Sequence, residues 1–194
     1  MSSINSYFNF VFVHVPKTSG TSMEKIFPGG GHSTLHDYST QCDLEKYFKW
    51  TFIRNPYDRV ASFFFNIRTW VGTEGLIKEK YKEDLESFIL ELDQWVVIDP
   101  KYNTKYDYHK YPIHLFPIDY FILTDNHKMD FIGYFEKLEK DWVFIKNKFN
   151  IDKPLNHDNK SKGLSSYQDL YTADMKKVIQ RIYQSDFKYY PKLK

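Results

Sequence analysis

The chain has 194 residues, of which 42% are hydrophobic and 27% charged, as in an ordinary globular protein with one sizeable core. The formal net charge is only +2, so the composition does not indicate nucleic-acid binding. The single cysteine, Cys42, excludes an intrachain disulfide and a cysteine-based zinc site. The sequence contains no apolar run of about 18 residues, so no transmembrane helix is predicted. The N-terminal apolar run matches a strand better than a signal peptide. We therefore expect one soluble, cytoplasmic domain over residues 1–194, with no membrane partner.

The first informative stretch begins with an apolar run over Phe8–Val15, which predicts a buried strand. A short helical pattern that includes Met23 comes shortly afterwards. Small polar residues fill the turn between them: Pro16, Lys17, Thr18, Ser19, Gly20, Thr21 and Ser22. Backbone N–H groups at the start of a helix are unpaired and suit an anion, and glycine allows a close approach of the backbone. The pattern favours phosphate binding, and an ordinary strand–turn–helix is the alternative.

This turn is not a Walker A loop. In that motif the lysine follows the second glycine and directly precedes the Ser or Thr that binds magnesium. Here Lys17 comes before Gly20, and the turn has no glycine before the lysine. We therefore expect a phosphate group rather than a magnesium-bound triphosphate.

A second stretch repeats the strand-to-helix pattern. The apolar residues from Trp50 to Ile53 predict a short buried strand, with Arg54 at its carboxyl end. Asn55-Pro56 then predicts the start of a helix, because asparagine caps helices and proline suits their first position. Ser62 lies just off the apolar face of this helix. Arg54 and Ser62 are therefore expected at the carboxyl end of a strand, where open α/β sheets bind ligands, although a surface ion pair is the alternative for Arg54.

The rest of the chain alternates helical and strand patterns, which predicts an α/β fold with a largely parallel sheet. In chain order we expect a glycine-rich break after Pro28, a short helix from Asp43 through Phe48, a loop with some helix at Trp70–Lys82, a helix from Asp84 to about Val97, a loop at Asp99–Pro112, an apolar segment His114–Leu123 broken by Pro117, a strand Asp130–Phe135, an amphipathic helix Glu136–Phe149, a polar loop Asn156–Ser166, and a final helix capped by Thr172.

The two stretches, HVPKTSGTS and FIRNPYDRVASFF, together resemble the two cofactor signatures of sulfotransferases that use PAPS (3′-phosphoadenosine 5′-phosphosulfate). They are most similar to the carbohydrate branch that includes the heparan sulfate 2-O- and 6-O-sulfotransferases and short bacterial relatives. The segments FIGYFEKLEKDWVFI and SYQDLYTADMKKVIQRIYQSDF also resemble this branch. The turn has Thr-Ser-Gly where Thr-Gly-Gly is common. The resemblance implies a P-loop-like three-layer fold with a central, mostly parallel sheet flanked by helices.

By this resemblance, residues 16–22 wrap the 5′-phosphosulfate of PAPS, and Lys17 touches the bridge between phosphate and sulfate. Arg54 and Ser62 hold the 3′-phosphate. These roles suit the residue types, because arginine offers a planar fork of donors and lysine a compact charge. No metal ion is expected, since lysine, arginine and backbone dipoles handle the charge.

The resemblance also implies a catalytic base. His32, in the stretch GHSTLHDY, resembles the base-bearing stretch of the 2-O-sulfotransferase branch and precedes Arg54 by 54 − 32 = 22 residues. Histidine suits the role because its unperturbed pKa of about 6.5 lies near operating pH. His36, His109, His114 or an acidic residue are alternatives. The expected reaction is in-line transfer of the sulfuryl group from PAPS to a hydroxyl of an acceptor, expected to be a saccharide.

Two other functions are compatible with the sequence: a small P-loop kinase and a non-catalytic nucleotide-binding module. The position of Lys17 and the lack of a clear Walker B strand argue against the kinase, and the presence of both Lys17 and His32 argues against the module. Aromatic residues suited either to stacking on sugar rings or to packing are Trp70, Trp95, Tyr102, Tyr106 and Tyr108. The sequence indicates neither the identity of the acceptor nor an oligomeric state.

Overall fold

A computed structural model of the chain describes residues 4–28, 31–67, 73–96, 112–155 and 168–190. The chain divides into two compact units. The first comprises Met1–Arg54 and Ile118–Lys160, and the second comprises Asn55–Pro117 and Ser161–Lys194. The assignment of residues 1–194 to a single domain stays a prediction.

The first unit contains a four-stranded sheet in the spatial order β1-β2-β3-β4. Its strands are β1 (Ile4–Asn5), β2 (Phe10–Phe12), β3 (Phe48–Ile53) and β4 (Phe131–Tyr134). The strands β2, β3 and β4 are parallel, and only the two-residue β1 is antiparallel to its neighbour. The carboxyl ends of the three parallel strands therefore point the same way.

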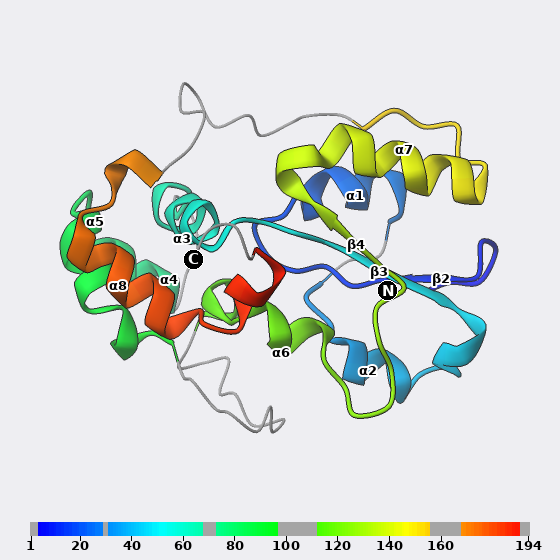
Figure 1. The fold of residues 1–194 in the computed structure, drawn as a ribbon, viewed down its shortest axis with the longest axis horizontal. Helices are drawn as coiled ribbons and strands as arrows, with labels where there is room; N and C mark the ends of the chain where they lie inside the picture. The colour runs from blue at the N-terminus through cyan, green and yellow to red at the C-terminus, as the bar shows by residue number, and fades with distance from the viewer. Residues whose placement is uncertain (1–3, 29–30, 68–72, 97–111, 156–167, 191–194) are drawn as a thin grey trace. The chain divides into compact units, whose positions relative to one another are not determined.

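Helices cover both faces of this sheet. Those of the first unit are α1 (Gly20–Ile26), α2 (Leu35–Ser39), α6 (Ile118–Ile122) and α7 (Leu138–Phe149), with short 3-10 helices at Leu44–Lys46 and Phe135–Lys137. The helices α1 and α7 lie on one face, and α2, which packs with α6, lies on the other (Figure 1). The α/β fold with a mostly parallel sheet flanked by helices is confirmed.

Aromatic side chains form the core between the sheet and α1 and α7. Successive residues of a strand point to opposite faces, and the alternate residues Phe10 and Phe12 of β2 join the same cluster as Trp50 and Phe52 of β3. Trp50 is fully buried, and its indole lies 6.5 Å from that of Trp142 on α7, at an angle of 36°. Packing thus accounts for many of the aromatic residues in this part of the chain.

The second unit is mainly helical. Its helices are α3 (Pro56–Phe65), α4 (Thr73–Tyr81), α5 (Leu85–Leu90) and α8 (Ala173–Ile182), with 3-10 helices at Leu92–Gln94, Ile113–Leu115, Gln168–Leu170 and Asp186–Tyr189. A buried ion pair joins Arg59 to Asp186 at 3.0 Å. The buried Tyr183 hydroxyl donates to the Leu115 carbonyl over 2.7 Å, and burial raises the pKa of that hydroxyl.

Several sequence-based boundaries were wrong. The strand expected at Phe8–Val15 is reduced to β2. The helix expected through Phe48 is only the 3-10 helix Leu44–Lys46, because Phe48 pairs with Phe10 and so belongs to β3. The helix expected from Asp84 to Val97 ends at Leu90 and tightens into a 3-10 helix.

The helix starts were predicted better than the lengths. Asn55 Oδ1 accepts a hydrogen bond from the Tyr57 backbone N–H at the start of α3, and Thr172 caps α8 in the same way through Met175. The helix α2 was missed, although Thr34 and Asp37 form a reciprocal capping box at its start. Expected segments at 99–111 and 156–166 lie outside the described residues. No helix in the described ranges is long and apolar enough to cross a membrane.

Candidate active site

The turn after β2 has a tightly folded backbone. Lys17 and Ser19 both adopt left-handed conformations, with φ angles of 66° and 77°. Between them, the buried Thr18 hydroxyl donates to the Val15 carbonyl over 2.6 Å and closes the turn. The Ser19 side chain makes no capping hydrogen bond to α1. Turns that contain left-handed residues can direct successive N–H groups into an anion-binding concavity, so this local structure suits the phosphate-binding prediction.

The other predicted members of the turn differ in exposure. Pro16 and Ser22 are buried, Lys17 is half-buried and Thr21 is exposed. Gly20, the first residue of α1, is required by its surroundings, because an added Cβ would lie 1.5 Å from Nε2 of His14. The imidazole of His14 therefore lies directly against the start of α1.

Arg54 lies beside this turn. It follows β3 immediately and is buried, with 7% of its surface exposed, so it is not a surface ion pair. One guanidinium nitrogen, Nη1, lies 3.5 Å from the Lys17 carbonyl oxygen, and the guanidinium carbon lies 4.2 Å from the centre of the Phe135 ring. The structure thus brings Arg54 together with the turn from the first stretch. Ser62 is buried on α3 in the second unit, and its pairing with Arg54 stays a prediction.

His32 contacts the residue segment that leads into the same turn. Its Nδ1 is 3.3 Å from the carbonyl oxygen of His14. The two imidazole rings are 4.4 Å apart between centroids, and the Phe121 ring of α6 lies 6.5 Å from that of His32. A carbonyl oxygen can only accept, so in a neutral His32 ring this hydrogen bond requires the proton on Nδ1 and makes Nε2 the unprotonated nitrogen. That tautomer is the one that a general base acting through Nε2 requires.

Gly31 sets the direction in which the chain enters His32. Its φ angle is +112°, a conformation that residues with a Cβ rarely adopt, and nothing lies within 4 Å of the position that a Cβ would occupy. The glycine is therefore needed here for its backbone conformation and not for lack of space.

Sequence reasoning missed two ionisable residues beside His32. The Nδ1 atom of His14 lies 3.4 Å from Oε1 of Glu24 on α1. The contact with His14 is the main cause that lowers the pKa of the Glu24 carboxyl; the nearby His32 and a backbone hydrogen bond from Gly31 lower it further, and burial works in the opposite direction. Gly20 and Glu24 are four residues apart in α1 and so share a helix face, a signal that would have placed Glu24 near the turn.

The alternative bases have other surroundings. His36 is exposed on α2. His114 is buried in the second unit, where its Nδ1 lies 2.7 Å from Oε1 of Glu74. His109 lies outside the described residues. Among the histidines that the structure describes, His32 is the predicted base that lies beside the turn.

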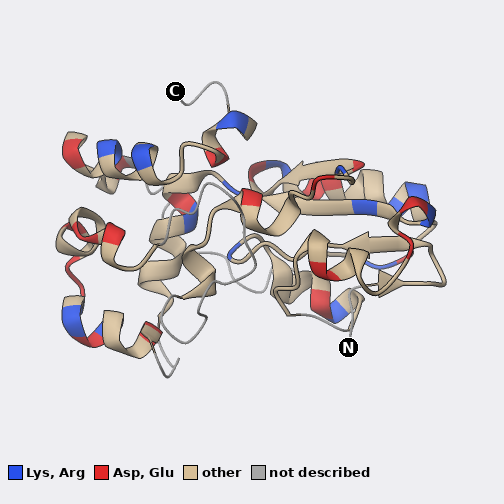
Figure 2. Cartoon of the chain, turned by 90° about the horizontal axis from the view of Figure 1, so that it is seen from below, with Lys and Arg blue, Asp and Glu red and all other residues tan. Residues whose placement is uncertain are grey.

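Charge at the site is local. Figure 2 shows acidic and basic residues interspersed along the same helices instead of gathered in one basic stripe. The positive charge beside the turn therefore comes from Lys17 and Arg54. Within the described residues, no group of three or more His, Cys, Asp or Glu side chains is arranged to hold a metal ion.

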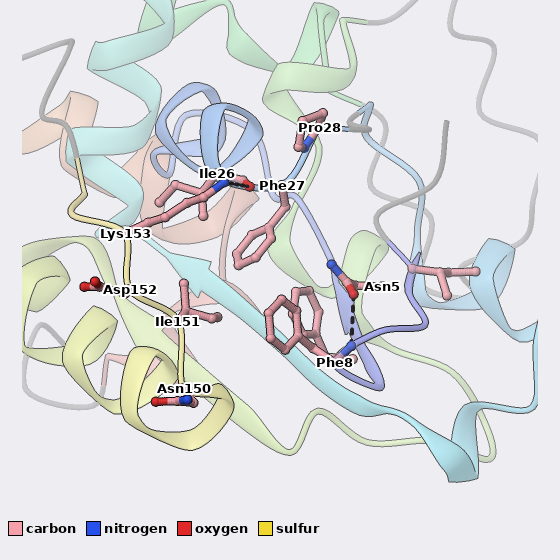
Figure 3. Close-up of a pocket in the computed structure, with 11 residues that line it drawn as sticks. Asn5, Phe8, Ile26, Phe27, Pro28, Asn150, Ile151, Asp152 and Lys153 are labelled. Carbon is pink, nitrogen blue, oxygen red and sulfur yellow. Dashed lines mark hydrogen bonds between the residues drawn. The ribbon is translucent and has the colours of Figure 1, made fainter.

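The first unit also has a cavity of about 280 Å³ at the opposite end of the strands (Figure 3). Phe8, Phe10 and Phe27 line it together with residues 150–153, which follow α7. These residues lie near the amino end of β2 and the carboxyl end of α1. None of the predicted site residues lines this cavity, so it is separate from the candidate active site.

Comparison with known families identifies the chain. A model of the sulfotransferase family matches residues 30–192, which is most of the sequence, so the chain belongs to the sulfotransferase family. The match includes His32, Arg54 and Ser62 but begins after the turn at residues 16–22. No curated protein and no solved structure matches the chain significantly. Family membership supports a transferase that moves a sulfuryl group.

Proposed function

We propose that this protein transfers the sulfuryl group of PAPS to a hydroxyl group of a saccharide acceptor. The observation that carries the proposal is the contact between Arg54 and the Lys17 carbonyl. It places the ends of two separate strand-to-helix stretches together, as expected if both bind parts of one doubly phosphorylated nucleotide. Family membership supports the reaction class, and the resemblance of the sequence motifs supports the donor and the acceptor class.

In the proposed reaction PAPS supplies the sulfuryl group. Residues 16–22 wrap the 5′-phosphosulfate. Lys17 and the backbone N–H groups of residues 17–21 stabilise the negative charge that develops on the phosphate oxygen as the sulfur leaves, because Pro16 has no N–H and the N–H of Ser22 donates to the Ser19 carbonyl. Arg54 suits the 3′-phosphate because its guanidinium is a planar fork of donors. The stacking of Arg54 on Phe135 fixes the plane of that fork.

His32 is assigned as the general base. Its Nε2 takes the proton of the acceptor hydroxyl while the hydroxyl oxygen forms its bond to sulfur and the bond from sulfur to the phosphate oxygen breaks. Positioning and electrostatic stabilisation supply most of the acceleration, as in phosphoryl transfer. The hydrogen bond from Nδ1 to the His14 carbonyl supports this assignment, because it leaves Nε2 as the basic atom.

The donor is tested by thermal shift. Adenosine 3′,5′-bisphosphate should raise the Tm of the protein in a concentration-dependent manner, because a ligand that binds only the folded state stabilises it. ATP with magnesium is the comparison ligand, and a larger shift with ATP would favour a kinase and contradict the proposal. Arg54→Lys should reduce the shift given by the bisphosphate, since lysine cannot offer a bidentate fork.

The reaction is tested with PAPS labelled in its sulfate. The label should appear in one or more members of a panel of saccharides, and the position of the new sulfate ester identifies the acceptor hydroxyl. A panel of phenols and simple alcohols serves as the comparison for the saccharide class. Binding of the bisphosphate without transfer to any acceptor would instead indicate a non-catalytic nucleotide-binding module.

A further inference from the structure

We propose that Glu24 and His14 are positioning residues that hold His32 in the orientation and protonation state needed for proton transfer. This inference rests on the proposed role of His32 as the base. Neither residue is assigned a contact with the donor or the acceptor. Both act through His32, from two different elements: His14 follows β2, and Glu24 lies on α1.

His14 contacts His32 twice. Its carbonyl oxygen accepts from Nδ1 of His32, which determines the tautomer. Its imidazole lies 4.4 Å from that of His32 between centroids and limits the tilt of the second ring, and His14 as a whole is only 8% exposed. The ring of Phe12 stacks on that of His14 with 6.2 Å between centroids, and Gly20 has no side chain that would displace the His14 ring. His14 is thus held from several directions and in turn holds His32.

Glu24 ties the two histidine segments to α1. Its carboxylate faces Nδ1 of His14 at 3.4 Å and accepts a hydrogen bond from the backbone N–H of Gly31, the residue before His32. The distance of 3.4 Å is long for a strong hydrogen bond, so the interaction with His14 is mainly electrostatic. The Gly31 contact holds the backbone just before His32 and therefore affects the position of its imidazole.

The arrangement also has a consequence for charge. When Nε2 of His32 accepts a proton, the ring becomes an imidazolium with Nδ1–H still directed at the His14 carbonyl. A nearby carboxylate favours the charged form of an imidazole, so Glu24 strengthens His32 as a base. The groups placed around His32 include the ionisable His14 and Glu24 and the apolar Phe121 of α6.

The test uses Glu24→Gln in the full chain, which removes the charge and keeps the shape of the side chain. We expect kcat to fall by about tenfold with the KM for PAPS within about twofold of wild type, since positioning is lost and donor binding is not. The acidic limb of the pH–rate profile should move to lower pH, because removal of a carboxylate lowers the pKa of His32. Glu86→Gln makes the same chemical change at an exposed position on α5 and should leave all three quantities unchanged.

A second measurement does not depend on activity. Titration of the imidazole nitrogens by NMR, with His32→Ala used to assign the signals, should show Nδ1 protonated in neutral His32. It should also show a lower His32 pKa in Glu24→Gln. His14→Phe keeps a ring but loses the link to Glu24, so adding Glu24→Gln to it should change the pKa less than in the wild-type background.

The outcomes separate this inference from the proposed function. An unchanged His32 pKa and an unchanged kcat in Glu24→Gln would overturn the positioning role, even if His32 proves essential for transfer. Conversely, a shifted pKa in Glu24→Gln combined with full activity of His32→Ala would overturn the base assignment and leave the electrostatic coupling intact. Nε2 rather than Nδ1 protonated in neutral His32 would contradict both the tautomer and the role of the His14 carbonyl.

Discussion

The carbonyl oxygen of His14 accepts a hydrogen bond from Nδ1 of His32 at 3.3 Å. His14 is only three residues before Lys17, so the chain that forms the anion-binding turn also orients the proposed base. The turn and His32 are thus directly linked within the first unit, and Arg54 lies beside the turn. Changes in the turn are therefore expected to affect both donor binding and proton transfer.

The imidazole of His32 should be essential for transfer but not for nucleotide binding. His32→Ala is expected to lower kcat by roughly 10²–10⁴, the usual contribution of a general base. The thermal shift given by adenosine 3′,5′-bisphosphate should remain. His36→Ala, at an exposed position on α2, is the matched control and should retain activity. If His36→Ala were the inactive variant, the base assignment would have to move to α2.

The Lys17 ammonium should matter for both the donor and the rate. Lys17→Ala is expected to lower the transfer rate by about 10²–10³, as for the loss of one donor that stabilises developing negative charge. Lys25→Ala removes a charge from an exposed position in the last turn of α1 and should have little effect. Single-turnover kinetics with labelled PAPS separate the chemical step from binding. Unchanged turnover in Lys17→Ala would remove Lys17 from the mechanism.

Substitution of Gly31 should displace His32 without a steric clash. At φ +112° an added Cβ is strained although nothing lies within 4 Å of it, so Gly31→Ala is expected to destabilise the protein by about 1–2 kcal/mol. If the backbone relaxes to avoid the strain, kcat should fall by more than the lost stability explains, because His32 moves with it. Denaturation by urea measures the first effect, and rates taken well below the Tm measure the second. Wild-type kcat in this variant would show that the backbone conformation of Gly31 is not needed to position His32.

The buried ion pair of the second unit should be important for stability. Arg59 and Asp186 are 1% and 0% exposed, so Asp186→Asn leaves a guanidinium buried without its counter-charge. The expected loss is about 3–5 kcal/mol of the free energy of unfolding. Asp93→Asn breaks the exposed pair with Arg181, which is about half accessible to solvent, and should cost less than about 1 kcal/mol. Urea denaturation of both variants tests the contrast, and equal losses would contradict it.

The contribution of Glu24 to stability should depend on pH. Its folded-state pKa lies below the ordinary value of 4.5, so the folded protein binds this proton less tightly than the unfolded chain does. The stabilisation is therefore fully present above the ordinary pKa and is lost as the pH falls through the lower folded value. The Tm difference between wild type and Glu24→Gln should accordingly be larger at neutral pH than in acid. A difference that stayed constant down to strongly acidic pH would show that the carboxylate charge is not involved.

Local signals predicted the parts of the fold that depend on few residues. Asn55 and Thr172 marked helix starts because a capping side chain acts on backbone groups two or three positions away. The helix α7 was predicted from an apolar face that the structure buries through Leu138, Trp142 and Ile145. The ends of β2 and α5 were less predictable, because pairing with neighbouring strands and tertiary contacts determine where those elements stop.

The site was predictable only in part for the same reason. Lys17 and Arg54 each follow an apolar strand, and the carboxyl ends of parallel strands meet at one edge of a sheet. The residue pattern associated Arg54 with Ser62, and only the family resemblance assigned Lys17 and Arg54 to one donor. His14 was hidden within the apolar run of the first strand, where the pattern favoured a purely structural residue. Its relation to Glu24 and His32 depends on how the chain returns after residue 28, and no periodicity in the sequence encodes that return.

The paired indoles of the aromatic core make the first unit optically distinctive. Trp50 and Trp142 are both buried, 6.5 Å apart and tilted by 36°, a separation at which their electronic transitions couple. The near-ultraviolet circular dichroism of the folded chain should carry this coupled signal. Melting followed at these wavelengths would report on the sheet beneath the proposed active site, which makes the tryptophan pair a built-in probe of that unit.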